Sequence, residues 1–246
     1  MQQLSASNIL NIWEIAISLS PSERALTMLT LACPDMTGDD LSALPIGQRD
    51  GLLLNIREKT FGSRLSGFTQ CPKCCEGIEL SFSTEDIRAN QGPPAARENR
   101  SFELADADIR VRFRLLDSRD LVAVKQSKDS RGAAVLLADR CILEVSRGGE
   151  PIGLTDLPIA VLNRVAACII ESDPLTEVLL DLHCPACGHT WRMLFDIESF
   201  LWAEISAAAK RLLREVHVLA SVYGWSEADI LSMSTARRHL YLEMVS

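Results

Sequence analysis

Two CxxC knuckles, more than one hundred residues apart, constrain the fold of this chain more than any other feature. They are Cys71-Pro72-Lys73-Cys74 and Cys184-Pro185-Ala186-Cys187. A turn that contains proline holds its two sulfurs on the same side, and four thiolates from two such turns suit a tetrahedral zinc ion. We therefore predict a structural Zn²⁺ site formed by Cys71, Cys74, Cys184 and Cys187, which would tie distant parts of the chain together.

The segments that follow the two knuckles resemble each other. An ungapped alignment of Cys71 on Cys184 places Ile78 on Trp191, Leu80 on Met193, Phe82 on Phe195, Glu85 on Glu198 and Ile87 on Phe200. Each knuckle is thus followed by alternating apolar positions, which are typical of a strand, and then by the start of a helix. The pattern predicts two similar β-hairpins that each lead into a helix.

Two other uses of the paired cysteines fit the sequence less well. A redox pair needs a thioredoxin-like setting in which a helix begins at the motif, and here strands follow it. A pair of disulfides needs an oxidising compartment. The start of the chain, Met1 to Leu4, shows no secretory signal, so eight cysteines indicate a reducing cytoplasm.

The remaining cysteines and the nearby histidines are predicted to lie outside the metal site. Cys75 aligns with Gly188 and is interpreted as a turn residue. His183 and His189 flank the second knuckle and are interpreted as surface groups or neighbours of the ligands. Buried free thiols are expected at Cys33, Cys141 and Cys168, because free cysteine packs as a small hydrophobic residue.

Composition excludes some classes of function. The 246 residues carry a formal charge of -8, which disfavours sequence-independent nucleic-acid binding, because that binding depends on Lys and Arg neutralising phosphates. No segment approaches the roughly 20 consecutive apolar residues of a membrane-spanning helix. The sequence contains no HExxH, no glycine-rich phosphate loop and no GxSxG, so we predict that the protein is not an enzyme.

The pattern of elements predicts an α+β protein: a split four-cysteine zinc ribbon with an α/β insertion and mainly helical ends. We expect an N-terminal helical segment (1–66), a first knuckle hairpin (67–88), the insertion (89–177), a second knuckle hairpin (178–196) and a C-terminal helical arm (197–246). Helix caps are expected at Ser20, Ser118, Thr155 or Asp156, Ser226 and Ser234. Residues 35–43 are expected to form a loop.

Two stretches raise the question of what they bind. The strand 109–115 places Arg110, Arg112 and Arg114 on one face, and we interpret this as a solvated face in preference to an anion site. In the arm, apolar residues recur at three- and four-residue steps from Leu201 to Tyr223, which predicts a helix about 40 Å long. A helical domain or a partner must bury that apolar stripe.

Several segments resemble the T4-type baseplate hub assembly chaperone family of contractile tails, which occurs in phages and in extracellular injection systems. They are 181–189, 195–197 and 200–204 around the second knuckle, then 211–217, 223–227, Ile230-Leu231 and Arg237-Arg238, and nearer the N-terminus 47–50, 52–54 and Phe61-Gly62. The resemblance is weak between about 90 and 150. The sequence departs from the family pattern at Cys75, where glycine is expected.

The resemblance implies a non-enzymatic assembly role, with baseplate or hub proteins of a contractile tail as partners. It implies a cytoplasmic location in the bacterial host and leaves open whether the protein stays in the finished particle. Trp225, Arg237, Arg238 and Tyr241 are predicted partner contacts, since aromatic and arginine side chains dominate binding hot spots. Packing of the last two helices is the alternative. A zinc-ribbon nucleic-acid-binding or regulatory protein, supported by the three strand arginines and Arg119, is the second hypothesis.

Overall fold

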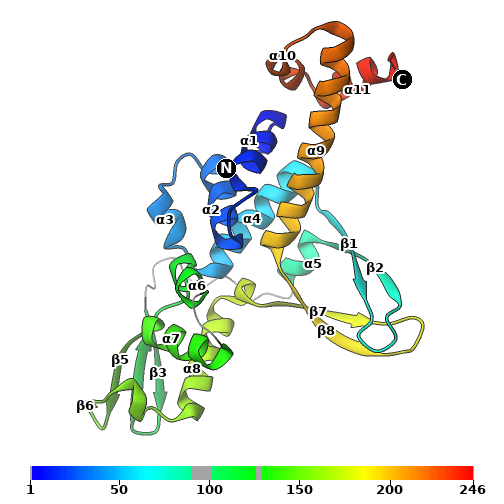
Figure 1. The fold of residues 1–246 in the computed structure, drawn as a ribbon. Helices are drawn as coiled ribbons and strands as arrows, with labels where there is room; N and C mark the ends of the chain where they lie inside the picture. Colours follow the sequence, from blue (N-terminus) through cyan, green and yellow to red (C-terminus); the bar gives the residue numbers. More distant parts are fainter. Residues whose placement is uncertain (1, 90–100, 126–128, 246) are drawn as a thin grey trace. The chain divides into compact units, whose positions relative to one another are not determined.

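The computed structural model describes residues 2–89, 101–125 and 129–245 (Figure 1). The chain divides into two compact units. The first comprises Met1–Thr37, Leu53–Gly62 and Asp196–Ser246, and the second comprises Gly38–Leu52 and Ser63–Phe195. The predicted fold class is confirmed: the structure is mixed α+β, has helical termini, and brings the four knuckle cysteines together from two hairpins. The division into five segments stays a prediction, and residues 90–100 of the insertion lie outside the described residues.

The first unit is helical. It contains α1 (Ala6–Ala16), α2 (Pro21–Ala32), the second half of α4 (Ile46–Phe61), α9 (Ile197–Tyr223), α10 (Glu227–Ser232) and α11 (Thr235–Glu243). α9 packs against α1, α2, α10 and α11. None of the helices in the described part of the chain is long and apolar enough to cross a membrane.

The apolar stripe of α9 is the core of this unit. Leu201, Ile205, Leu212 and Leu219 are all buried, as is Ile12 of α1 opposite them. The helix ends at Gly224, whose φ of 69° belongs to the left-handed region that favours glycine. The expected helical domain therefore covers most of the stripe.

The second unit combines hairpins, a small sheet and short helices. It contains α3 (Gly38–Ser42), the start of α4, the hairpin of β1 (Arg64–Gln70) and β2 (Gly77–Ser83), and α5 (Thr84–Ala89). A four-stranded antiparallel sheet follows in the order β3 (Phe102–Asp106), β4 (Ile109–Phe113), β5 (Ile142–Arg147), β6 (Glu150–Pro151). The other elements are α6 (Ser118–Val124), α7 (Ser130–Cys141), α8 (Ile159–Ser172), the hairpin of β7 (Val178–His183) and β8 (Thr190–Phe195), and the 3₁₀ turns Leu154–Asp156 and Pro174–Thr176.

The small sheet has its own hydrophobic core. Alternate residues of β4 are buried, with Val111 and Phe113 both 1% exposed, and α8 supplies Val161, Val165 and Ile169 to the same cluster. Apolar residues recur every second position in β4 and every fourth position in α8, so each element has one apolar face. The predicted α/β insertion is therefore a sheet covered by a helix.

Some sequence predictions of local structure are wrong. Residues 35–43 contain the short helix α3, and β3 was not predicted. The cap of α6 is Asp117 instead of Ser118, because its carboxylate accepts the backbone N–H of Arg119 at 2.9 Å. Thr155 and Asp156 lie in a 3₁₀ turn, and α8 begins after Pro158. The caps at Ser226 and Ser234 are confirmed, and Ser20 makes the expected capping box with Glu23.

Two of the three arginines of the predicted strand 109–115 form ion pairs, which the interpretation as a solvated face did not include. Arg112 pairs with Glu144 of β5. Arg114 donates to both carboxylate oxygens of the fully buried Asp120, at 2.7 and 2.8 Å, and Arg140 donates to the same group. Burial opposes ionisation of Asp120, but these hydrogen bonds lower its pKa to about 2. Asp120 of α6 therefore connects Arg114, immediately after β4, with Arg140 of α7.

The N-terminus of α4 is held by a residue from the end of α8. The Asp173 carboxylate accepts the backbone N–H of Gly47 at 2.7 Å and the hydroxyl of Thr176 at 2.8 Å. A Cβ at Gly47 would lie 2.2 Å from an Asp173 oxygen, so only glycine fits there. Burial raises the pKa of Asp173, although both hydrogen bonds act in the opposite direction.

Candidate metal centre

The first knuckle is the tip of the β1–β2 hairpin. The strands pair in register from Arg64↔Ser83 to Gln70↔Gly77, which places the turn immediately after β1. Within the turn, the Cys71 N–H donates to the Glu76 carbonyl at 2.9 Å, and the Cys75 N–H donates to the Cys71 carbonyl at 2.9 Å. These bonds fold the chain back on itself and bring Cys71 and Cys74 to one side of the turn.

The second knuckle reproduces this geometry. The strands pair from Val178↔Phe195 to His183↔Thr190. The Cys184 N–H donates to the His189 carbonyl at 2.8 Å, and the Gly188 N–H donates to the Cys184 carbonyl at 3.0 Å. The register and both turn hydrogen bonds therefore match those of the first hairpin when Cys71 is aligned with Cys184.

The two tips bring four sulfur atoms together. All four Sγ atoms lie within 4.8 Å of one another, with 3.7 Å between Cys71 and Cys187 and 3.6 Å between Cys74 and Cys184. A tetrahedron with Zn–S bonds of about 2.3 Å has S···S edges of roughly 3.8 Å, so these two pairs have the spacing that zinc needs. Cys71 and Cys184 are buried, whereas Cys74 and Cys187 lie at the surface. The quartet is therefore a potential metal site with a protected and an accessible side.

The acidity of the thiols also suits a cation. Burial opposes ionisation of Cys71, but backbone N–H groups of Cys74 and Lys73 and the thiols of Cys74 and Cys187 lower its pKa to about 7. For Cys74 the backbone N–H of Glu76 lowers the pKa, yet the three neighbouring thiols and burial raise it to about 12. One thiolate thus forms readily and the next forms with difficulty, unless a dication compensates the added negative charge.

Neighbouring residues do not add a fifth sulfur or nitrogen ligand to this group. Cys75 is an exposed turn residue with φ of 60°, matching Gly188 with φ of 70°, as the alignment predicts. His189 stacks on Trp191, with ring centroids 5.8 Å apart. Among the described residues, no second group of three or more cysteine, histidine and acidic side chains has the spacing of a metal site. Cys33 and Cys141 are buried free thiols, as predicted, and Cys168 is partly buried.

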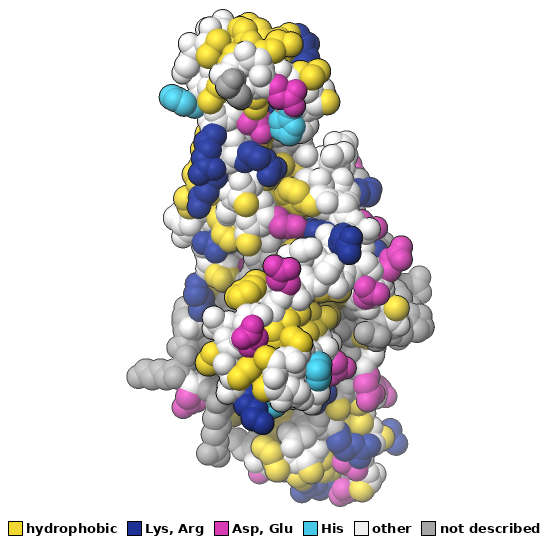
Figure 2. Space-filling model, turned by 90° about the vertical axis from the view of Figure 1, so that its right-hand side faces the viewer, with side chains coloured by type: hydrophobic (Ala, Val, Ile, Leu, Met, Phe, Trp, Pro, Cys, Tyr) yellow, Lys and Arg dark blue, Asp and Glu magenta, His cyan; other side chains and the backbone are white. Residues whose placement is uncertain are grey.

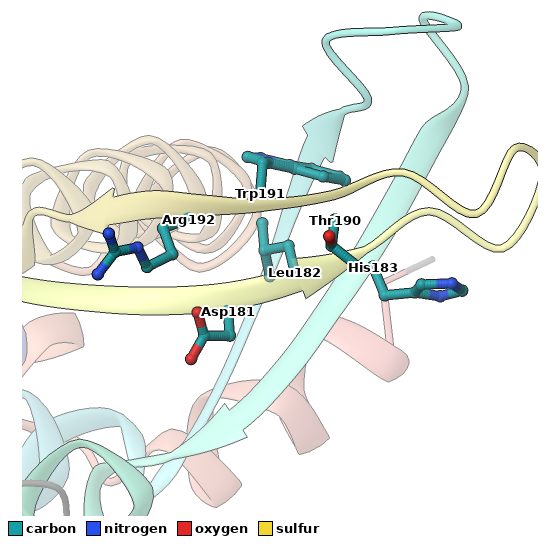
Figure 3. A pocket seen from close by; sticks show the side chains of 6 residues that line it. All are labelled: Asp181, Leu182, His183, Thr190, Trp191 and Arg192. Atoms are coloured by element: carbon teal, nitrogen blue, oxygen red, sulfur yellow. The ribbon is translucent and has the colours of Figure 1, made fainter.

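An open pocket lies beside the second hairpin. Its lining residues come from both strands: Asp181, Leu182, His183, Thr190, Trp191 and Arg192. Figure 3 shows Trp191 and Asp181 pointing to opposite sides of the hairpin, as the alternation of a strand requires. None of the four cysteines lines this pocket.

The two hairpins are related by an approximate two-fold symmetry. Exchanging each residue for its aligned partner turns the Cys71–Cys187 contact into the Cys184–Cys74 contact. Phe82 and Phe195 are also aligned partners, and their rings meet edge to face at 5.3 Å. The metal site and this aromatic pair therefore lie where the two hairpins meet, in the manner of a dimer interface.

The repeat extends beyond what the sequence analysis found. At the same offset, Leu44-Pro45-Ile46 aligns with Leu157-Pro158-Ile159, and these tripeptides begin α4 and α8. The first residue of α5, Thr84, aligns with the first residue of α9, Ile197. Each copy is therefore helix, hairpin, helix. The repeated Leu-Pro-Ile was the signal in the sequence that could have revealed the leading helix of each copy.

The residues predicted to contact a partner lie at the end of α9 and on the segments after it. Trp225 stacks on Tyr223 at 4.4 Å and meets Tyr241 edge to face at 4.8 Å. Arg237 lies over the ring of Tyr241 at 5.7 Å. Arg238 is only 4% exposed and donates to Glu215 at 3.0 Å, so in this structure it anchors α11 on α9. Partner binding by these four residues stays a prediction.

Comparison with known proteins places the chain in a family. The model of the family described as T4 bacteriophage base plate protein matches residues 19–202. The chain belongs to the T4 bacteriophage base plate protein family. The matched segment includes both knuckles and both copies of the repeat up to the start of α9. No curated protein and no solved structure matches the chain.

Proposed function

We propose that this member of the base plate family is a non-enzymatic assembly protein, a chaperone or scaffold, for the baseplate hub of a contractile phage-tail-like particle. The observation that supports it best is the cysteine quartet, built from both copies of an internal repeat in a chain of this family. Its partners would be baseplate or hub proteins, and it would act in the cytoplasm of the bacterial host where particles assemble.

Zinc would have a structural role in this proposal. Cys71, Cys74, Cys184 and Cys187 would supply four thiolates, which is the composition of closed structural sites. Such a site has no open coordination position for a substrate, and the metal-binding free energy becomes folding free energy. The ion would fix the two hairpins to each other and so present a rigid second unit to a partner.

The nucleic-acid hypothesis loses much of its support. Of the four arginines that favoured it, Arg112 pairs with Glu144, Arg114 with Asp120, and Arg119 with Asp117 at its own helix cap. Guanidinium groups held by carboxylates are poorly available to phosphates. With a formal charge of -8 for the chain, a protein partner is the better supported choice.

Native mass spectrometry tests this proposal. The chain would be measured alone and after co-expression with each baseplate and hub protein encoded beside it. We expect one zinc ion per chain and a defined complex with one of these proteins, with the same result for a Cys75→Ser control. A metal-free chain that binds none of them would overturn both parts, and a salt-dependent mobility shift with DNA would then favour the second hypothesis.

A further inference from the structure

The far end of α9 carries an aromatic cluster that the repeat and the metal site do not use. Tyr223, Trp225 and Tyr241 contact one another at ring-centroid distances between 4.4 and 5.6 Å. All three rings are only partly buried. Aromatic clusters in a core lose nearly all of their exposure, so this cluster is packed and still accessible.

Exposed apolar side chains lie next to the cluster in the sequence. Val222 is 56% exposed, Leu240 57% and Met244 72%. Leu240 and Met244 are four residues apart at the end of α11 and share a face with Arg237. We call Val222, Leu240, Met244 and the three rings the C-terminal tip surface. Figure 2 shows hydrophobic side chains gathered over the top of the molecule, where Figure 1 places α10, α11 and the end of α9.

The tip surface is held rigidly. The Arg238 guanidinium donates to Glu215 of α9 at 3.0 Å and to the Met233 carbonyl at 2.6 Å, and both charged residues are buried. The Ser234 hydroxyl caps α11, and Gly224 lets the chain turn sharply after α9. An apolar surface that is fixed before binding costs little conformational entropy when a partner covers it.

A cationic stretch precedes the tip surface on α9. Exposed Lys210, Arg211 and Arg214 lie on the second half of α9, and the acid in this stretch, Glu215, is buried and neutralised by Arg238. Figure 2 shows dark blue side chains in a column along α9 below the apolar top. The acids Glu227, Asp229 and Glu243 lie on α10 and α11 instead. The cationic stretch thus contrasts with a chain whose formal charge is -8.

We infer that the C-terminal tip surface is a docking site for an amphipathic, acidic helix of another baseplate protein. The apolar face of such a helix would cover Trp225, Leu240 and Met244, and its acidic residues would face Lys210 and Arg214. This inference rests on the proposed function, because it takes the partner from the baseplate. An anionic membrane is a weaker fit, since the net negative charge of the chain opposes approach to it.

The test uses the full chain and the baseplate protein that co-purifies with it. Leu240→Asp with Met244→Asp places charge on the apolar surface without touching the Arg238–Glu215 pair. Val135→Asp is the matched control, because Val135 is 65% exposed on α7, in the other unit. We expect the tip variant to bind at least about tenfold more weakly and the control to bind as the unchanged protein does. Circular dichroism verifies that each variant is folded.

A charge variant tests the cationic stretch of α9 separately from the apolar tip surface. Arg214→Glu should slow association and reduce its dependence on salt, with a smaller effect on dissociation. Unchanged affinity in both the Leu240/Met244 and Arg214 variants, with the complex still formed, would overturn the docking site and leave the baseplate role intact. Failure of the unchanged chain to bind any baseplate protein would overturn both. A dimer of the chain that the tip variant abolishes, or binding to anionic vesicles in place of a protein, would also overturn the inference.

Discussion

The two helix–hairpin–helix copies share their turns and strand registers but differ in what surrounds them. Both knuckles have the same two backbone hydrogen bonds, the same pairing and a left-handed residue after the second cysteine. The helix after the first hairpin, α5, is described over six residues, whereas α9 runs for 27. The shared turns and registers position the four cysteines. The copies differ in the helix that follows the hairpin, which can contact other elements or partners.

The outer faces of the two hairpins differ, whereas their inner faces are alike. On β1, Phe68 is 67% exposed and its ring lies over Gly77, where a Cβ would come within 2.5 Å of it. Its counterpart on β7 is Asp181, across from Arg192 on β8. The inner positions instead stay apolar in both copies, as with Phe82 and Phe195. The two copies therefore share the inner face, where the hairpins contact each other, and differ on the outer face.

The largest expected effect comes from breaking the quartet in either copy. Because Cys71 and Cys184 are equivalent buried residues, Cys71→Ser and Cys184→Ser should each release zinc and lower the free energy of unfolding by several kcal/mol. Thermal unfolding with metal analysis measures both effects. Retention of zinc and an unchanged melting temperature in the Cys184→Ser variant would rule out the proposed site.

A smaller effect is expected in the segment between the copies. The pKa of Asp120 is lowered from 3.8 to about 2 in the folded state, so its stabilisation is present above about pH 4 and is lost as the pH falls towards 2. Asp120→Asn should cost about 2 kcal/mol near neutral pH, and the difference from the unchanged protein should shrink below about pH 4. Urea unfolding of both proteins across this range measures it. A constant difference at all pH values would contradict the assignment.

The left-handed turn position should respond with opposite signs in the two copies. Cys75→Gly relieves a side chain at φ of 60° and should stabilise by about 0.5–1 kcal/mol, whereas Gly188→Ala at φ of 70° should destabilise by about 1–2 kcal/mol. No heavy atom lies within 4 Å of the added Cβ at Gly188, so the cost there is backbone strain. Denaturant midpoints of the zinc-loaded variants give both values, and equal signs would show that the turns are not equivalent.

The smallest effect concerns the first residue of the helix after each hairpin. Thr84 is fully buried and its hydroxyl has no hydrogen-bond partner among residues 2–89, 101–125 and 129–245, whereas the equivalent Ile197 is apolar. Thr84→Val should therefore stabilise the protein by up to about 1 kcal/mol. Thr190→Val, on an exposed strand position, is the control and should change the unfolding free energy little. A loss of stability at Thr84→Val would indicate a hydrogen bond that forms in solution.

The hairpins and the long helix could be predicted because their signals are local. Cys-Pro-x-Cys turns, alternating apolar positions and the step of three to four residues from Leu201 to Tyr223 each act within a few residues. The ion pairs could not be predicted in this way. Arg114 contacts Asp120 only once β4 and α6 have packed. Asp173 and Gly47 are 126 residues apart in the sequence and meet only in the folded second unit. Strand β3 was missed because its partner, and not its own short sequence, defines it.

The place of the quartet between two copies of one unit has a consequence for how the site forms. In a symmetric homodimer, a metal shared between subunits is bound only at concentrations where the subunits associate. Here Cys71, Cys74, Cys184 and Cys187 belong to one polypeptide, so the second hairpin is always present at a high effective concentration near the first. Metal loading of a single newly made chain would therefore be independent of how much of the protein the cell contains.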